Sequence, residues 1–215
     1  MPTLWQAAAA SMPASLLPAL LLAAVGVLGA IPPVERWNER VSIFLQGPDE
    51  QPLTVLGDIT GWLFSGQLLL PAALVLCLVL LLRGRVLLAF SAGVIFPLIA
   101  VEAILKLLID RPPASAYLRV RVLTISPGTG IRALEHGFPS GHAARIAFAI
   151  GWLALLLTPR RYRWLVLSGM LLLTLFVCWT RIYVGDHSLL EIVAGLLLAT
   201  AFLPLAAALM ALARG

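Results

Sequence analysis

Two of the three histidines in the chain stand in short motifs whose residue types suit phosphate chemistry. Pro139-Ser140-Gly141-His142 precedes an apolar run, so Ser140 can cap a helix there while Gly141 permits close approach. The free N–H groups and the positive dipole end of such a helix attract an anion, and His142 in the first turn would lean toward it. Taken alone, the motif is more typical of an ordinary helix cap.

The second motif begins at Arg181 and ends at Glu191, with His187 between them. Glu191 follows His187 by four residues, so on a helix the carboxylate can accept a hydrogen bond from the imidazole. This bond would fix the tautomer and leave the other ring nitrogen free to act as a nucleophile or base. An interfacial charge cluster that anchors helix ends is the alternative for this motif alone.

The elements that position these motifs are predicted to be membrane helices. Of the 215 residues, 61% are apolar and 12% are charged, and the mean hydropathy is +1.00. A helix needs about 20 mostly apolar residues to cross the hydrocarbon layer. We therefore expect one all-α domain, residues 1–215, with six transmembrane helices at Ser15–Ile31, Trp62–Leu82, Val86–Ile109, His142–Thr158, Trp164–Tyr183 and Leu189–Ala213.

Arginine placement predicts the orientation of this bundle, because short loops rich in Lys and Arg stay cytoplasmic. Such arginines follow the second and fourth spans and end the chain, at Arg83, Arg85, Arg160, Arg161, Arg163 and Arg214. Both termini are then cytoplasmic, and both histidine motifs face outward, toward the periplasm if the protein lies in a bacterial inner membrane.

The segment Pro32–Gly61 separates the first two predicted spans. Within it, Trp37, Val41, Phe44 and Leu45 fall on one face of a predicted helix, which suits a helix lying in the membrane interface. A structured loop with a short surface helix is the alternative.

With a third element, Lys106 followed after four residues by Arg111-Pro112, the chain resembles the type 2 phosphatidic acid phosphatase family. These integral membrane enzymes remove phosphate from lipid phosphates, and their pattern is Lys, six residues, Arg-Pro; Pro-Ser-Gly-His; and Ser-Arg, five residues, His, three residues, Asp. The six spans and the long loop before Pro139 also match the family layout. By motif, the resemblance covers about Leu105 to Gly195.

The resemblance implies a role for each matching residue. His187 would be the nucleophile that forms a phosphohistidine, Glu191 would orient it, and His142 would be the general acid. Arg181, Ser140 and the Gly141 amide would hold the phosphoryl oxygens, where charge develops during transfer. Lys106 and Arg111 would complete the binding site. The family needs no metal or other cofactor, and no carboxylate cluster here has metal-ligand spacing.

Three positions depart from the family pattern. Pro113 stands where the family has arginine, so Arg111 would have to serve from a shifted backbone. Thr180 replaces serine and keeps the hydroxyl. Glu191 replaces aspartate and keeps the carboxylate, and Asp186 could share its orienting role.

Arg145 lies outside the family pattern, three residues after His142 and on the same predicted helix face. An arginine inside a span generally faces a partner or a polar site. We expect Arg145 to supply the charge missing at Pro113 and to bind substrate, or to pair with Glu191, Asp186 or Glu102. Glu102 also has a predicted partner in Lys106, four residues on.

The outer loop carries further basic residues near the predicted site. Arg119, Arg121 and Arg132 would surround its mouth, and Arg119 and Arg121 could contact the second phosphate of a diphosphate such as a polyprenyl diphosphate. A solvated loop that merely carries arginine is the alternative. His136 is expected to lie in this loop without a catalytic role.

The predicted function is hydrolysis of a lipid phosphate or diphosphate at the outer leaflet, with membrane lipids as neighbours. A phosphotransferase that passes the phosphoryl group to a second lipid would use the same residues. A non-catalytic member that binds or moves lipid phosphates is the alternative of another class, although it would not need both histidines. The net charge of +5 suits anionic lipid headgroups, and no basic tract with interleaved aromatic residues predicts nucleic-acid binding.

Overall fold

Helices make up the framework of the chain, because within lipid only an internal ladder of hydrogen bonds satisfies the backbone. The computed structural model describes residues 4–109, 111, 113–121, 137–158 and 160–214, and these ranges hold helices and no strand. The helices are α1 Leu4–Leu28, α2 Pro32–Gln46, α3 Gln51–Leu63, α4 Gly66–Leu82, α5 Val86–Gly93, α6 Ile95–Leu108, α8 Gly141–Leu157, α9 Arg163–Tyr183 and α10 Leu189–Arg214, with 3-10 turns η1 Ala114–Ala116 and η2 Arg160–Tyr162.

The all-α membrane bundle is confirmed, but the count of six spans is not. Four helical segments are long and apolar enough to cross a membrane: Ser11–Leu28, Val86–Leu108, Trp164–Tyr183 and Leu189–Arg214. A fifth is obtained if α3 and α4, which meet at an angle of 42°, count as one broken span. The predicted fourth span is α8, an apolar helix of only 17 residues.

The break between α3 and α4 has a local cause. Ser65 adopts an extended backbone conformation, and its side chain accepts a hydrogen bond from Leu68 N, so it starts a new helix. The sequence prediction began the second span at Trp62 and missed α3, which packs against α9.

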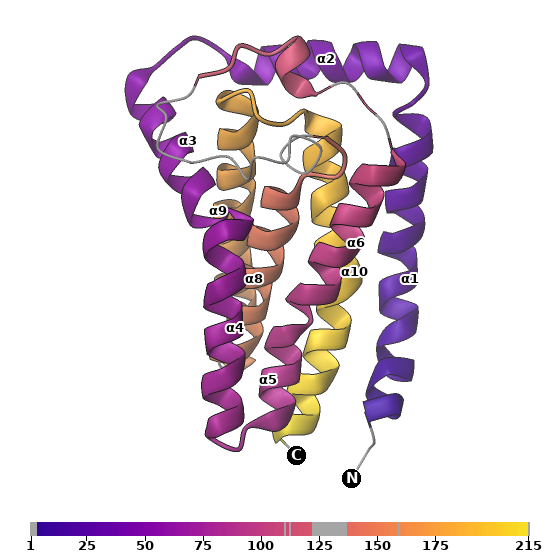
Figure 1. The fold of residues 1–215 in the computed structure, drawn as a ribbon, viewed down its shortest axis with the longest axis vertical. Coiled ribbons are helices and arrows are strands. Elements are labelled where there is room, and N and C mark those ends of the chain that lie inside the picture. Colours follow the sequence, from indigo (N-terminus) through magenta and orange to yellow (C-terminus); the bar gives the residue numbers. More distant parts are fainter. Residues whose placement is uncertain (1–3, 110, 112, 122–136, 159, 215) are drawn as a thin grey trace.

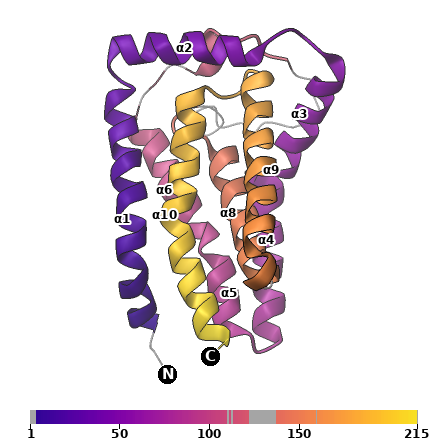
Figure 2. The same ribbon diagram turned by 180° about the vertical axis from the view of Figure 1, so that it is seen from behind.

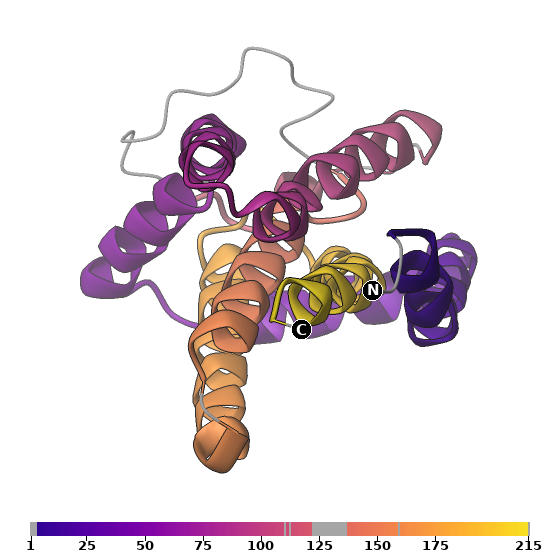
Figure 3. The same cartoon turned by 90° about the horizontal axis from the view of Figure 1, so that it is seen from below.

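Helix α10 is central to the packing of the bundle, where it contacts α1, α8 and α5 (Figures 1 and 2). Seen from below, α1 lies at the edge of the bundle beside α10 (Figure 3). Gly195 allows the close contact between α10 and α8, because a Cβ atom there would lie 2.3 Å from Ser140 O. The start of α8 is therefore held directly on the first turns of α10.

Helix α2 lies across one end of the bundle, while both chain ends lie at the other (Figure 1). The predicted helix is confirmed, although its placement in the membrane interface stays a prediction. Its buried face is polar: Asn38 Oδ1 accepts from Leu190 N and Ser42 Oγ accepts from Leu189 N. These bonds satisfy free N–H groups in the first turn of α10, so α2 caps that helix from outside.

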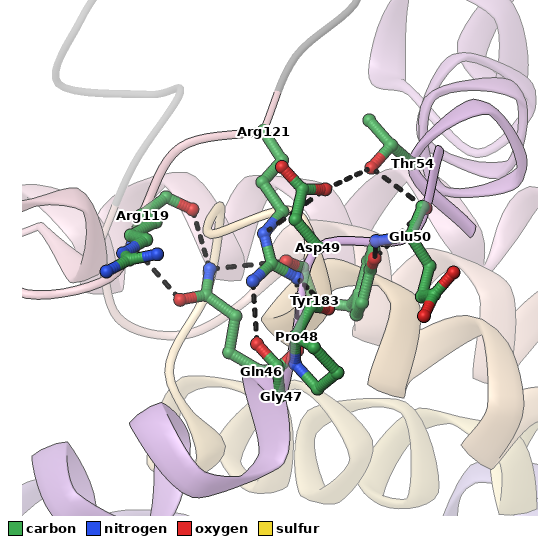
Figure 4. Close-up of polar contacts among 9 residues, drawn as sticks. All are labelled: Gln46, Gly47, Pro48, Asp49, Glu50, Thr54, Arg119, Arg121 and Tyr183. Atoms are coloured by element: carbon green, nitrogen blue, oxygen red, sulfur yellow. Dashed lines mark hydrogen bonds and ion pairs between the residues drawn. The ribbon is translucent and has the colours of Figure 1, made fainter. Parts of the chain in front are cut away.

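Arg121 holds the corner between α2 and α3 (Figure 4). Its guanidinium donates to three successive carbonyl oxygens and stacks 4.5 Å from the centre of the Tyr183 ring. The three acceptors belong to Gln46, Gly47 and Pro48, at distances of 2.7–3.1 Å. The expectation that Arg121 contacts a second phosphate is therefore wrong, because its side chain is buried and both of its terminal nitrogens donate to the end of α2.

We expect Gly195→Ala to destabilise the fold, because the added methyl group would meet the backbone of Ser140 and Ala144, which cannot move aside easily. Overpacking of this kind costs about 1–3 kcal/mol. Thermal unfolding in detergent measures the loss. Gly169→Ala is the matched control, since a Cβ atom at Gly169 in α9 meets nothing within 4 Å. Equal melting temperatures for the two variants would contradict the close contact between α8 and α10.

Candidate active site

The two motif histidines meet at the α2 end of the bundle. His187 lies in the link between α9 and α10, and its Nδ1 is 2.7 Å from Glu191 Oε2. Its Nε2 is 3.4 Å from Nδ1 of His142, in the first turn of α8. Because a carboxylate only accepts, Nδ1 of His187 donates in this contact, and Nε2 is the ring nitrogen directed at His142. His187 is only 1% exposed, whereas His142 is half-buried.

The start of α10 orients the His187–Glu191 pair. Ser188 precedes the helix, and its side chain accepts from Glu191 N at 3.4 Å. Gly185, with φ of +85°, makes the turn that brings the chain from α9 into this link. The predicted His187–Glu191 contact is confirmed, and His187 precedes α10, whose observed start at Leu189 is the predicted one. Asp186 contacts Arg181 instead of sharing the orienting role.

The Pro-Ser-Gly-His motif starts α8 as predicted. Ser140 is the N-cap residue, and its side chain accepts from Ala143 N at 3.3 Å. Its own backbone N donates to Glu191 O at 2.9 Å. One turn of α10 therefore positions both histidines: the side chain of Glu191 holds His187, and its backbone holds the residue before α8.

Glu102 on α6 joins the two predicted cations of this region. Its carboxylate lies 3.0 Å from Lys106 Nζ and 2.8 Å from Arg145 Nη1, and all three side chains are buried. Arg145 Nε also donates to Phe64 O at the break between α3 and α4. Of the partners predicted for Arg145, the structure selects Glu102.

Gly141 is required where this ion cluster approaches α8. A Cβ atom at Gly141 would lie within 1.9 Å of Glu102 Oε1 and 2.5 Å of Arg145 Nη1. The glycine of the motif thus gives room to buried charged groups beside the helix start.

Arg181 is buried against α3. It forms an ion pair with Asp186 at 3.0 Å and donates to Thr60 Oγ1 at 3.3 Å. Thr60 also lies 3.0 Å from the Thr180 hydroxyl, so the threonine that replaces the family serine keeps a hydrogen-bonding role. The charges of Arg145, Arg181 and Lys106 all act on His142 in the first turn of α8.

Thr60 was missed by sequence reasoning, although a signal was present. Gly57 and Gly61 stand four residues apart, a spacing of small residues that lets membrane helices approach closely. A Cβ atom at Gly61 would lie 2.0 Å from Arg181 Nη1, and one at Gly57 would lie 2.3 Å from Val184 Cγ1. This spacing identifies the face of α3 that packs on α9.

The side chain of Arg111 contacts α1 and not the two histidines. It donates to Gly26 O at 2.5 Å and lies 4.5 Å from the centre of the Phe138 ring. Burial lowers the pKa of Arg111, while the charge of Glu191 acts in the opposite direction. Pro113, where the family arginine was expected, is exposed at the start of η1. The side chain at that position cannot supply the missing charge.

Tyr117 follows η1 and, like Arg111, lies near Glu191. The two residues line a small pocket together with Asn38, Ser188 and Glu191. Burial raises the pKa of Tyr117 to about 12, so its hydroxyl stays protonated near neutral pH. Asn38 Nδ2 donates to this hydroxyl at 3.3 Å.

Several other predictions concern the loop before α8. Arg119 is exposed, and its backbone N donates to Gln46 Oε1 (Figure 4). Arg132 and His136 lie outside the described residues. Within the described part of the chain, no three His, Cys, Asp or Glu side chains are grouped so that they could hold a metal ion.

A family model described as the PAP2 superfamily matches residues 72–214, which include both histidine motifs and the Glu102 cluster. The chain belongs to the PAP2 superfamily. Among curated proteins, sphingosine-1-phosphate phosphatase 2 of Mus musculus is 35% identical over 74 residues, which are 33% of this chain. The match spans 21% of that relative's length.

The fold of this PAP2 protein is also found in a solved structure. The transmembrane PAP2-type phosphatidylglycerolphosphate phosphatase of Bacillus subtilis superposes with a TM-score of 0.69 at 16% identity, covering 95% of this chain and 96% of the other. At this identity, the similarity shows that the two proteins share a fold.

We expect Glu102→Gln to destabilise this PAP2 protein, because Lys106 and Arg145 would remain buried beside a neutral amide. Removing one partner of a buried ion pair costs about 3–5 kcal/mol. Thermal unfolding in detergent measures the change, with Glu39→Gln as the control because Glu39 forms no ion pair with any described residue. A melting temperature equal to that of the control would show that Glu102 does not hold the two cations.

Proposed function

We propose that this PAP2 protein is a membrane phosphatase that hydrolyses a lipid phosphate or diphosphate through a phosphohistidine at His187. The observation that carries the proposal is the buried contact between His187 and Glu191, with Nε2 of His187 directed at His142. A nucleophile, an orienting carboxylate and a second proton-transfer group are thereby in place. A protein that only binds phosphate needs the cations but has no use for this arrangement.

In the first step, Nε2 of His187 attacks phosphorus, and the bond from phosphorus to the leaving oxygen breaks. His142 donates a proton to that oxygen, so the leaving group departs as an alcohol or a protonated phosphate. Glu191 accepts the Nδ1 hydrogen bond of His187 and stabilises the positive charge that forms on the ring. In the second step His142 takes a proton from water, which attacks phosphorus and releases His187.

His142 must move for the phosphoryl group to enter. Its Nδ1 lies at hydrogen-bonding distance from Nε2 of His187, which leaves no room for a phosphoryl group between the two rings. His187 is held by Glu191 and is almost fully buried, whereas His142 is half-buried. The His142 ring is therefore the one that turns aside when substrate binds.

The phosphoryl oxygens require several donors, since their negative charge is greatest during transfer. Arg181, Lys106 and Arg145 are the cations near the two histidines, and the N-terminus of α8 adds the backbone N–H of Gly141 and the Ser140 hydroxyl, since the Ser140 N–H is taken by Glu191 O. We assign the missing family arginine to Arg145 and not to Arg111, because Arg111 donates to the end of α1.

The setting of the site in a multi-pass membrane protein supports a lipid substrate. Both similar proteins reported above are named as phosphatases of phosphorylated lipids. We further propose that the α2 end of the bundle faces outward in the inner membrane. Arg83, Arg85 and Arg214 lie at the opposite end, near both chain termini, as the charge rule for cytoplasmic loops predicts (Figure 1).

The direct test is phosphate release by purified protein in detergent, with a chelator present, from a polyprenyl diphosphate, phosphatidylglycerophosphate and phosphatidic acid. We expect release from at least one of them, and a loss of more than about 10³-fold in His187→Ala, because the nucleophile is removed. Asp49→Asn is the control, because Asp49 lies at the same end of the bundle and its side chain is exposed. Absence of release by folded wild-type protein, or equal release by His187→Ala, would contradict the proposal.

The assignment of Arg145 has its own test. Arg145→Ala should lower kcat/KM by about 10²-fold, the loss typical for removal of one donor to a developing charge. Arg111→Ala should cost less than about tenfold by the same reasoning. Arg145→Lys should recover part of the loss if positive charge is what matters. A larger loss in Arg111→Ala than in Arg145→Ala, with both proteins folded, would reverse the assignment.

A further inference from the structure

Acidic residues are unevenly distributed between the two ends of the bundle, whereas basic residues occur at both. The chain has ten Asp and Glu residues, at positions 35, 39, 49, 50, 58, 102, 110, 135, 186 and 191. The eight that the structure describes lie on α2, the α2–α3 link, α3, α6, the α9–α10 link and the first turn of α10. The α4–α5 turn, the α8–α9 link and the end of α10 carry six arginines and no acidic residue: Arg83, Arg85, Arg160, Arg161, Arg163 and Arg214.

The end of the bundle with these six arginines and no acidic residue contains a cavity. It has a volume of about 710 Å³ and lies between the α4–α5 turn, the start of α5 and the ends of α8 and α10. Arg85 and Arg214 line it from two different elements. Gly84, with φ of +71°, makes the tight turn that places Arg85 at the start of α5.

The two arginines differ in how they are held. Arg214 is fixed, because its Nη2 donates to Leu155 O at 3.0 Å and to Leu156 O at 2.9 Å. The side chain of Arg85 is exposed and forms no hydrogen bond or ion pair with any residue that the structure describes. The fixed guanidinium of Arg214 therefore offers a preformed position for an anion. The guanidinium of Arg85 is free to turn toward the bound anion and donate to it.

The remaining wall of the cavity is largely hydrocarbon, with Val86, Leu88, Leu156 and Met210 among its residues. Apolar side chains of this kind would not stabilise a bound inorganic anion. A phospholipid offers both a phosphate for the arginines and acyl carbon for the apolar side chains, and it is the most abundant molecule at this depth of a membrane. Basic pockets between transmembrane helices bind anionic headgroups in this way.

We propose that this cavity binds the headgroup phosphate of an anionic phospholipid, held by Arg85 and Arg214, in the leaflet at the end of the bundle that carries both chain termini. The site is separate from the proposed catalytic centre, which lies at the α2 end. The occupant is a structural lipid and not the substrate. Because Arg214 joins α10 to the end of α8, lipid binding there stabilises the same pair of helices that position the two histidines.

The test uses the full chain in neutral detergent, titrated with phosphatidylglycerol or with phosphatidylcholine of the same acyl composition. Phosphatidylglycerol is a phosphodiester, so turnover at the proposed catalytic centre does not interfere. Lipid retention is measured by native mass spectrometry and thermal stabilisation by unfolding curves. We expect retention of phosphatidylglycerol over phosphatidylcholine, and about fivefold weaker retention in Arg85→Gln or Arg214→Gln, the effect of one basic residue near anionic lipid.

Two controls distinguish this lipid site from a diffuse charge effect and from a plain anion site. Arg83→Gln removes an exposed arginine from the same turn that does not line the cavity, and it should retain the lipid as wild type does. Inorganic phosphate at equal concentration should not displace the lipid, whatever it does at the proposed catalytic centre. An equal loss in Arg83→Gln would indicate the diffuse charge effect and overturn the proposal. Displacement of the lipid by inorganic phosphate would show the plain anion site and overturn it too.

Discussion

A charge buried in an apolar helix bundle has to be paired, and this constraint organises the site end of the molecule. Lys106 and Arg145 share the carboxylate of Glu102, Arg181 is paired with Asp186, and His187 is held by Glu191. The Arg145–Glu102 pair joins α8 to α6, and the Arg181–Asp186 and His187–Glu191 pairs fix the link between α9 and α10. The backbone then adapts to the pairs, as the need for glycine at position 141 shows.

The same constraint explains which parts could be predicted from the sequence. Helix starts and local pairs depend on near neighbours, so the Ser140 cap, the His187–Glu191 contact and the Lys106–Glu102 pair follow from spacing alone. The all-α class follows from hydropathy. The motifs by themselves also indicate the PAP2 superfamily, because their residue types are specific.

What could not be predicted depends on contacts between distant segments. The acceptors of Arg121 are carbonyl oxygens at the end of α2, which no pattern around Arg121 indicates. Arg111 likewise bonds to the end of α1, more than eighty residues earlier in the chain. Helix α3 was missed because most of it lies in the segment Pro32–Gly61, which was assigned to the connection between the first two spans. Helix α2 places its polar residues inward, toward the N-terminus of α10.

The central claim is that His187 becomes covalently phosphorylated, and a trapping experiment tests it most directly. Protein incubated with substrate labelled in the transferred phosphate is quenched in alkali, and the label on the denatured chain is located by peptide mapping. The account predicts alkali-stable, acid-labile label on His187 in wild-type protein and none in His187→Ala. Turnover without any label on the chain, or label that persists in His187→Ala, would contradict it.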